Sequence, residues 1–417
     1  MKIPHLRWYI AALLFTATVI NYVDRQVLSI LAPVLTTELH LSPVQYANIL
    51  WGFQSAYAVM YLVSGILVDR WGTRRAMTAF MTWWSISNML HAFARSAFGL
   101  GAFRVLLGIG EPGNFMAASK AASEWYPPKE RAFMNGVANS GAAMGAIIAA
   151  PLIVGLYRSF GWRSAFVITG AAGLLWLVAW LWLYRLPAVH PLITPEELLL
   201  IREPRSPQPA PAKRMRWADL LRYPQTWGLF WSRFLSDPVW WFYLFWLPKY
   251  LVEQRGFSMA QIGLLAWLPY LTADLGSVSG GLLSGFLVKR GWMPLQARVA
   301  GMWPFAMLMP LSVIIPYTPS AGTALTVISI VTFAHMAWKT NQNTVTNDIY
   351  PVEVVGSVSG LAAFGNGLGG ALFTWMTGHI VQDFSYNAVF IIMGFLHPAA
   401  FLVFQLLVKK PITRPES

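Results

Sequence analysis

The chain is divided into apolar stretches that are long enough to cross a membrane as helices. A helix needs about 20 apolar residues to span the hydrocarbon core of a bilayer, and a window of roughly that length finds about twelve such stretches. Only 11% of the residues are charged and 56% are hydrophobic, which leaves too little polar surface for a soluble protein of 417 residues. We therefore expect an all-α membrane protein with twelve transmembrane helices, at residues 8–34, 46–68, 76–94, 98–121, 133–157, 164–184, 225–250, 260–288, 298–316, 321–347, 355–380 and 386–408.

A polar segment at 185–224 separates two halves of six predicted spans each, 1–184 and 225–417. The segment is rich in proline and arginine, a composition typical of a cytoplasmic linker. An internal repeat relates the two halves, and at an offset of 224 residues it matches Glu124, Tyr126 and Pro127 with Asp348, Tyr350 and Pro351. A parallel repeat of this kind predicts two pseudo-symmetric halves with a substrate site between them near the middle of the membrane, and alternating access by rocking of the halves.

The formal net charge of +13 comes mainly from loops predicted on one side of the membrane, including 69–75 and the linker. This distribution follows the positive-inside rule, so it predicts a multi-pass protein of the cell inner (cytoplasmic) membrane with both termini in the cytoplasm. It also explains the charge without nucleic acid as a partner. The chain has no cysteine, which excludes disulfides and thiolate metal sites.

Ionisable residues lie inside three of the predicted spans, where each charge costs about 2.5–3.5 kcal/mol on insertion scales. Three pairs of them are Asp24 and Arg25 in the first span, Arg104 and Glu111 in the fourth, and Arg233 and Asp237 in the seventh. Such residues are usually retained because they face a polar cavity and bind or move ions. We interpret them as binding and coupling groups of a transporter, although charges that merely neutralise one another and hold helices together are the alternative.

Arg104 and Glu111 are seven residues apart, so they share one face of a helix about 10 Å from each other. The surrounding GIGEPG spells a glycine-rich fingerprint, but no strand precedes it, so we expect close helix packing and a bend beside Glu111 rather than a dinucleotide site. Asp24 is the best proton acceptor, because burial favours its neutral form and Arg25 its charged form. A static pair of Asp24 with Arg25 is the rival interpretation.

Polar residues of the second half leave more alternatives open. The guanidinium of Arg233 matches the two-pronged geometry of a carboxylate, which makes it a second candidate clamp. His335, which the repeat aligns with Glu111, either lines the cavity or is structural. Lys339, one turn further along the same predicted helix, either adds positive potential for an anion or pairs with Asp274 or Asp237.

The loop GILVDRWGTRR resembles the signature loop of the major facilitator superfamily. Asp69 can accept charge-assisted hydrogen bonds and so latch one conformation, while the glycines allow close approach of helices; a charge cluster that only sets topology is the alternative. The repeat places Lys289 where the first copy has Asp69, so a latch in the second half is in doubt. The predicted latch comprises Gly65, Asp69, Arg70, Gly72 and Arg74.

Further motifs make the resemblance more specific. NYVDR, the Arg104 to Glu111 segment and SEWYPPKERA resemble the anion:cation symporter branch of that superfamily, and RFLSDPVWW, LAWLPYLTADLG and FAH resemble bacterial hexuronate transporters. The resemblance implies the major facilitator fold and proton coupling through Asp24 and Glu111. It also implies a set of substrate-binding residues, which together with the residues singled out above are Tyr22, Arg25, Tyr57, Arg104, Arg233, His335 and Asn366.

The sequence, with this resemblance, therefore predicts a proton-coupled symporter that imports an organic anion of the hexuronate type, such as glucuronate or galacturonate. An aldonate such as galactonate is the alternative substrate, although Ala142 stands where the galactonate type carries a glutamine. A proton-driven drug exporter is disfavoured, because GVANSGAAMG replaces the Gly-Pro motif of that group; a sugar-acid sensor is a further alternative. We expect no enzymatic activity, no cofactor other than the coupled proton, and a monomer that functions in the lipid bilayer.

Overall fold

The computed structural model describes residues 2–127, 130–201, 217–350 and 352–409. The ordered segments of this described part are helices, and it contains no strand. Proximity of Cα atoms divides the chain into two compact units. The first unit is Met1–Leu41, Asn48–Gln208 and Met259–Trp267, and the second is Ser42–Ala47, Pro209–Ser258 and Leu268–Ser417. Part of the predicted linker, 202–216, lies outside the described residues.

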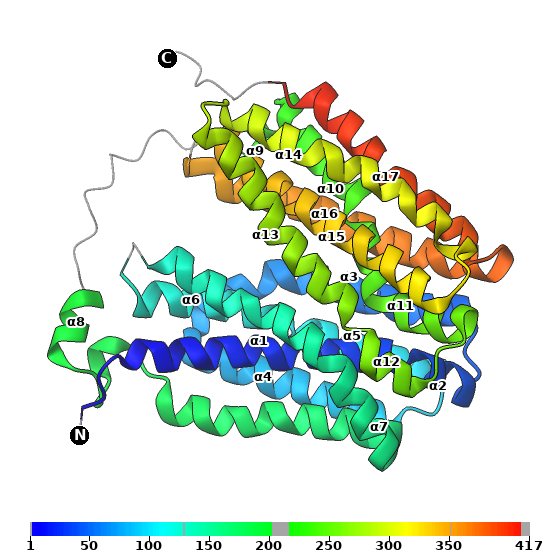
Figure 1. Cartoon of the computed structure of the whole chain (residues 1–417). Helices are drawn as coiled ribbons and strands as arrows, with labels where there is room; N and C mark the ends of the chain where they lie inside the picture. The colour runs from blue at the N-terminus through cyan, green and yellow to red at the C-terminus, as the bar shows by residue number, and fades with distance from the viewer. Residues whose placement is uncertain (1, 128–129, 202–216, 351, 410–417) are drawn as a thin grey trace. The chain divides into compact units, whose positions relative to one another are not determined.

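The helices of the first unit run side by side over most of their length, with α1, α4 and α7 in close contact (Figure 1). Ile10, Leu14 and Ala17 are among the buried apolar residues of α1. The elements are α1 (Leu6–Ile30), α2 (Ala32–Glu38), α3 (Pro43–Trp71, whose first residues group with the second unit), α4 (Thr73–Leu90), η1 (His91–Phe93), α5 (Ala97–Gly110), α6 (Pro112–Trp125), α7 (Arg131–Leu183), η2 (Pro187–Val189), α8 (Pro195–Ile201) and α12 (Met259–Leu265).

In the second unit, α13 packs along α15, and α10 packs against α16 and α17. The buried side chains of Leu229, Met302, Trp338 and Phe404 belong to one apolar core cluster. The elements are α9 (Trp217–Leu220), α10 (Pro224–Ser236), α11 (Pro238–Arg255), α13 (Leu268–Lys289), α14 (Pro294–Leu308), η3 (Met309–Tyr317), α15 (Ala321–Ile349), α16 (Val352–Asp383) and α17 (Tyr386–Leu407).

Each of the twelve predicted spans falls on one or two of these helices. Two predicted spans lie within α7, whose residue Gly161 has φ 81° and ψ 168°, so a non-helical residue separates them. Several other predicted spans are made of two shorter helices in series, for example α5 with α6 and α10 with α11. Among the described residues, seven helical stretches are long and apolar enough to cross a membrane, judged by length and composition.

Two of the interrupted spans break at the same kind of dipeptide, an acid followed by proline. α5 ends before Glu111 and α6 begins at Pro112, while α10 ends before Asp237 and α11 begins at Pro238. Proline lacks a backbone N–H and clashes with the preceding turn, so it begins a helix more readily than it continues one. The bend expected beside Glu111 is thereby confirmed, and each break places a carboxylate in the middle of a span.

Glycines hold α13 unusually close to α15. A methyl group added to Gly276 would lie 2.1 Å from the carbonyl oxygen of Phe333, and one added to Gly280 would lie 2.4 Å from that of Ala337. Both obstacles are backbone atoms, which cannot rotate away. Small residues four apart let membrane helices approach in this way, so the pair fixes the separation of these two helices.

We expect Gly276→Ala to lower the thermal unfolding midpoint of the purified protein, because the added methyl forces α13 and α15 apart at a cost of about 1–3 kcal/mol. The matched control is Gly285→Ala on the same helix, where the methyl meets no atom within 4 Å. There the higher helix propensity of alanine should leave stability unchanged or slightly raised. Equal midpoints for both variants would contradict the close-packing argument.

Candidate functional site

Four ionisable side chains are buried together inside the first unit. Asp24 and Arg25 lie on α1, Arg104 lies on α5, and Glu111 lies at the junction of α5 and α6. Their residues are between 0% and 2% exposed. Charges that deep in a membrane span require partners, since leaving one unpaired costs several kcal/mol.

Arg25 and Glu111 form the central ion pair. Arg25 Nη2 lies 2.7 Å from Glu111 Oε2, and its Nε donates to the same oxygen at 2.8 Å. Asn21 supports the pair, since its amide Nδ2 donates to the Glu111 carbonyl and its Oδ1 accepts from Arg25, both at 3.3 Å. The pair links α1 to the break in the fourth span.

Arg104 reaches the same point from α5. Its Nη2 donates to the backbone carbonyl of Arg25 at 2.8 Å, and its guanidinium carbon lies 4.5 Å from the centre of the Phe53 ring. Arg104 and Glu111 therefore both contact Arg25, as expected for two residues on one face of a span. The carboxylate of Glu111 binds Arg25 rather than Arg104, a pairing that the spacing of residues in one span could not reveal.

Asp24 has a different partner from the one that the sequence suggested. Asn88 on α4 donates to Asp24 Oδ1 at 2.8 Å, and the same amide contacts Thr169 Oγ1 on α7 at 2.8 Å. Within the described part of the chain, Asp24 forms no ion pair with Arg25. Glu111 is therefore bound to a guanidinium and Asp24 to a neutral amide, while the charges of Glu111 and Arg104 also act on Asp24.

Aromatic rings surround the Arg25 guanidinium. The guanidinium carbon lies 4.6 Å from the ring centre of Tyr22 and 4.9 Å from that of Tyr57. Both tyrosines are partly exposed, whereas the arginine itself is 2% exposed. Tyr22 and Tyr57, two predicted substrate contacts, thus lie at the edge of the buried ion pair, where cation–π attraction holds the guanidinium in place.

The predicted latch loop joins α3 to α4. Asp69 Oδ1 accepts from Lys120 Nζ on α6 at 2.9 Å, and Lys120 also donates to the Val68 carbonyl at the end of α3. Gly72 has φ 78°, in the left-handed region that favours glycine. The Asp69 side chain is 80% exposed, so this ion pair is weak and easily broken, which suits a reversible latch.

Three other predicted latch residues are found near this loop. Arg74 Nη2 donates to the Leu181 carbonyl at 2.5 Å, Arg70 is exposed at the end of α3, and Gly65 makes only ordinary van der Waals contact. The second unit has an ion pair in the corresponding region, although Lys289 replaces the acid. Arg298 Nε lies 2.9 Å from Asp348 Oδ2 and so joins α14 to the end of α15.

The predicted substrate residues of the second unit are distributed over three helices. Arg233 on α10 donates to Asn343 Oδ1 at 2.6 Å, and Asn366 on α16 accepts from Trp241 Nε1 at 2.9 Å. His335 is 0% exposed, and its Nδ1 lies 3.0 Å from His397 Nε2 on α17. His335 therefore presents no exposed surface in this structure.

Lys339 has Asp237 as its ion-pair partner, which decides between the two acids considered above. Its Nζ lies 3.4 Å from Asp237 Oδ1. The second unit thus has a buried acid–base pair at its break, as the first unit has at Glu111.

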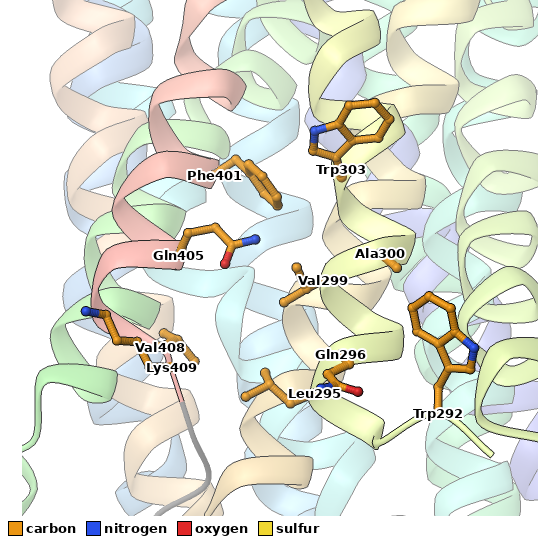
Figure 2. A pocket seen from close by; sticks show the side chains of 10 residues that line it. All are labelled: Trp292, Leu295, Gln296, Val299, Ala300, Trp303, Phe401, Gln405, Val408 and Lys409. Carbon is orange, nitrogen blue, oxygen red and sulfur yellow. The ribbon is translucent and has the colours of Figure 1, made fainter.

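A groove of about 800 Å³ lies between α14 and α17 of the second unit (Figure 2). Figure 2 shows Trp303 and Phe401 at one end of it and Lys409 beside Val408 at the other. None of its lining residues belongs to the predicted substrate, proton or latch sets. The groove is therefore separate from the candidate site.

Comparison with known proteins identifies the family. The family model described as Major Facilitator Superfamily matches residues 14–374. The chain belongs to this superfamily. It is accordingly a multi-pass membrane transporter rather than an enzyme, with the twelve-helix fold of that family.

Individual relatives agree with the resemblance found in the motifs. This major facilitator protein is 31% identical to the hexuronate transporter of Escherichia coli (strain K12), over 98% of this chain and 96% of that protein. It is 36% identical over 284 residues to the galacturonate transporter of Dickeya chrysanthemi, which covers 68% of this chain and 82% of that one. The crystal structure of a bacterial homologue of the human lysosomal transporter Spinster, inward-facing and occupied, matches with a TM-score of 0.82 at 19% identity over 100% of both chains, which shows the fold.

Several partners in this transporter were not apparent from the sequence. Asn88, Lys120 and His397 each complete a contact of a predicted residue, but each is at least 51 residues away along the chain. A buried polar residue in an apolar helix is the only available signal, and it gives no partner. Asn88 and His397 carry that signal, being 0% exposed inside α4 and α17.

Proposed function

We propose that this transporter imports a hexuronate, glucuronate or galacturonate, together with protons. The observation that carries the proposal is the buried pair of Arg25 with Glu111, flanked by Arg104 and two tyrosines. A guanidinium is the side chain best suited to bind a carboxylate in two-pronged geometry. The names of the hexuronate and galacturonate transporters support the same class of substrate.

Proton coupling follows from competition for Arg25. In this structure Glu111 occupies the guanidinium with a charge-assisted pair at 2.7 Å. When Glu111 takes up a proton, it loses its charge and most of its attraction to Arg25. The guanidinium then becomes available to the carboxylate of the substrate, so proton uptake and anion binding occur together.

Asp24 is the second proposed proton carrier. It is fully buried and bound to the neutral amide of Asn88, so a proton there does not compete with a cation at close contact. Alternating access in a bacterial inner membrane, with both termini in the cytoplasm and a monomer as the functional form, completes the proposal. Positive loops such as 69–75 and the repeat of the two halves support it.

The test is competition against labelled glucuronate in proteoliposomes. We expect galacturonate to compete, and glucose to bind roughly 10- to 100-fold more weakly, because a neutral sugar forfeits a charged hydrogen bond of about 1.5–3 kcal/mol. Galactonate is included, since preference for it over both uronates would assign the protein to aldonates. Equal competition by glucose would contradict recognition of an anion.

A further inference from the structure

The second unit contains a buried acid whose charge is poorly compensated. Asp237 is 0% exposed, and neither of its carboxylate oxygens accepts a hydrogen bond within the described part of the chain. Its ion-pair partner there is Lys339, at 3.4 Å. In the first unit, by contrast, Glu111 receives two nitrogens of Arg25 at 2.7 and 2.8 Å. A buried carboxylate held so loosely gains much from a proton, since neutralisation removes the cost of desolvating its charge.

Asp237 and Glu111 lie at helix breaks of the same kind, although not in spans that the repeat relates. Each acid directly precedes a proline at a helix break, at Glu111–Pro112 and at Asp237–Pro238. Glu111 is paired with Arg25 on α1, in the first span. Asp237 is paired with Lys339 on α15, in the tenth span. The internal repeat relates the first span to the seventh and the fourth to the tenth. The acid lies in the fourth span of the first unit but in the seventh span, the counterpart of the first, in the second unit. The base shows the reverse arrangement.

Lys339 is accessible, although Asp237 is not. The lysine side chain is 20% exposed and the aspartate side chain 1% exposed. Lys339 lies well inside α15, which spans Ala321–Ile349, where contact of an ammonium group with lipid is costly. A partly exposed lysine at this depth therefore favours a polar surrounding for its ammonium group, such as that of an anionic solute.

The other charged and titratable groups nearby are already engaged. Arg233, one turn before Asp237 on α10, interacts electrostatically with Asp237 but directs its Nη2 to Asn343 at 2.6 Å. His335 and His397 face Lys339, and their imidazoles are bonded to each other at 3.0 Å. Arg233 and Lys339 are thus the cations that face Asp237, and Lys339 is the accessible one.

We propose that Asp237 is a third proton-carrying acid of this transporter and that its protonation releases Lys339 to bind the carboxylate of the substrate. A proton from the aqueous side forms an O–H bond on Asp237, and the ion pair with Lys339 breaks. Lys339 remains an ammonium group and exchanges one carboxylate partner for another. When the substrate leaves, the proton leaves Asp237 and the ion pair forms again.

This inference rests on the proposed transport of an organic anion, but its first test needs no substrate. Infrared difference spectra of the purified protein, recorded between alkaline and mildly acidic pH, detect the carbonyl stretch of protonated carboxyl groups. We expect such a band in the wild type, to which Asp24 and Glu111 also contribute, and a weaker band in Asp237→Asn. The matched control is Asp383→Asn at the end of α16, an exposed acid whose removal should leave the band unchanged.

Lys339→Gln provides an independent variant in which Asp237 is intact. Loss of the neighbouring cation favours the neutral acid, so the same band should persist to higher pH than in the wild type. If Asp237→Asn does not yield folded protein, the shift of the band in Lys339→Gln tests the proposal by itself. A band whose pH dependence is unaffected by Lys339→Gln, or one whose intensity is unchanged in Asp237→Asn, would overturn the proposal and leave a static pair of Asp237 with Lys339.

Binding of labelled glucuronate separates failure of this inference from failure of the proposed function. If the wild type binds glucuronate, binding should weaken as pH rises, and Asp237→Asn should remove part of that pH dependence while retaining binding at high pH. Lys339→Gln should weaken binding mainly at acidic pH, where the wild-type lysine is released from Asp237. Absence of binding to the wild type would overturn the hexuronate assignment, whereas the infrared bands would still test Asp237.

Discussion

Replacing Glu111 with glutamine should abolish uphill accumulation of glucuronate in proteoliposomes while exchange of internal for external substrate continues. Glutamine has the shape of the protonated acid but has no proton to release. The guanidinium of Arg25 is then permanently free of its counter-ion, 2.7 Å away in the wild type. A carrier locked in the protonated form can still move loaded substrate in both directions, but a pH gradient can no longer drive it. The accumulation ratio should therefore fall to about one.

The variant also removes half of a fully buried ion pair, a change that can destabilise a protein by about 3–5 kcal/mol. Thermal unfolding and size-exclusion profiles must accordingly accompany the transport assay. Glu130→Gln is the matched control, because Glu130 also lies near an arginine, Arg7 at 3.6 Å, but its side chain is 34% exposed. This control should accumulate glucuronate normally. Uphill accumulation by folded Glu111→Gln protein would remove Glu111 from the coupling mechanism.

An inside-negative membrane potential without a pH gradient should drive accumulation of a monovalent uronate. Cotransport with one proton is electroneutral and ignores voltage, whereas cotransport with two protons carries one net positive charge inward. One charge moving through 100 mV is worth about 2.3 kcal/mol, which corresponds to roughly 50-fold accumulation at equilibrium. Asp24 beside Asn88 and Glu111 beside Arg25 supply sites for two protons, and a proton on Asp237 would add a further inward charge and strengthen the response to voltage.

Potassium gradients with valinomycin set the potential, and identical buffers hold the pH equal on both sides. Asp24→Asn should weaken the voltage response, because each substrate is then accompanied by one proton fewer. Asn88→Asp is not a suitable control, since it introduces a further acid, and Asp383→Asn serves better as an exposed acid of the second unit. Wild-type accumulation that is independent of voltage would rule out the two-proton model.

The fold could be predicted because each span needs about 20 apolar residues, a requirement that is local in sequence. Interruptions were predictable only where proline marks them. GIGEPG indicates the break at Glu111. The break at Asp237–Pro238 was not predicted, although it also has an acid followed by proline. Two spans are joined in α7 across Gly161, where the loop expected between them is reduced to a single non-helical residue.

Residues of the candidate site could be found, but their pairing could not. Charges inside apolar spans are rare enough to be noticed singly, which identified Asp24, Arg25, Arg104, Glu111 and Arg233. Pairing depends on how helices rotate and pack against each other, and these contacts join residues far apart in the chain. The sequence suggests a pair of neighbours, Asp24 and Arg25, whereas the structure pairs Arg25 with Glu111. The pair of Lys339 with Asp237 is one of the alternatives that the sequence offers for that lysine.

The ion pair of Arg25 with Glu111 also constrains how the protein is made. Glu111 follows Arg25 by 86 residues, so the first span leaves the ribosome long before its counter-ion is synthesised. Asp24 and Arg25 each oppose partitioning into lipid by about 2.5–3.5 kcal/mol while they lack partners. The first span therefore gains its full affinity for the bilayer only when the fourth arrives beside it. We therefore expect the early helices of this half to assemble at the translocon and enter the membrane together rather than one at a time.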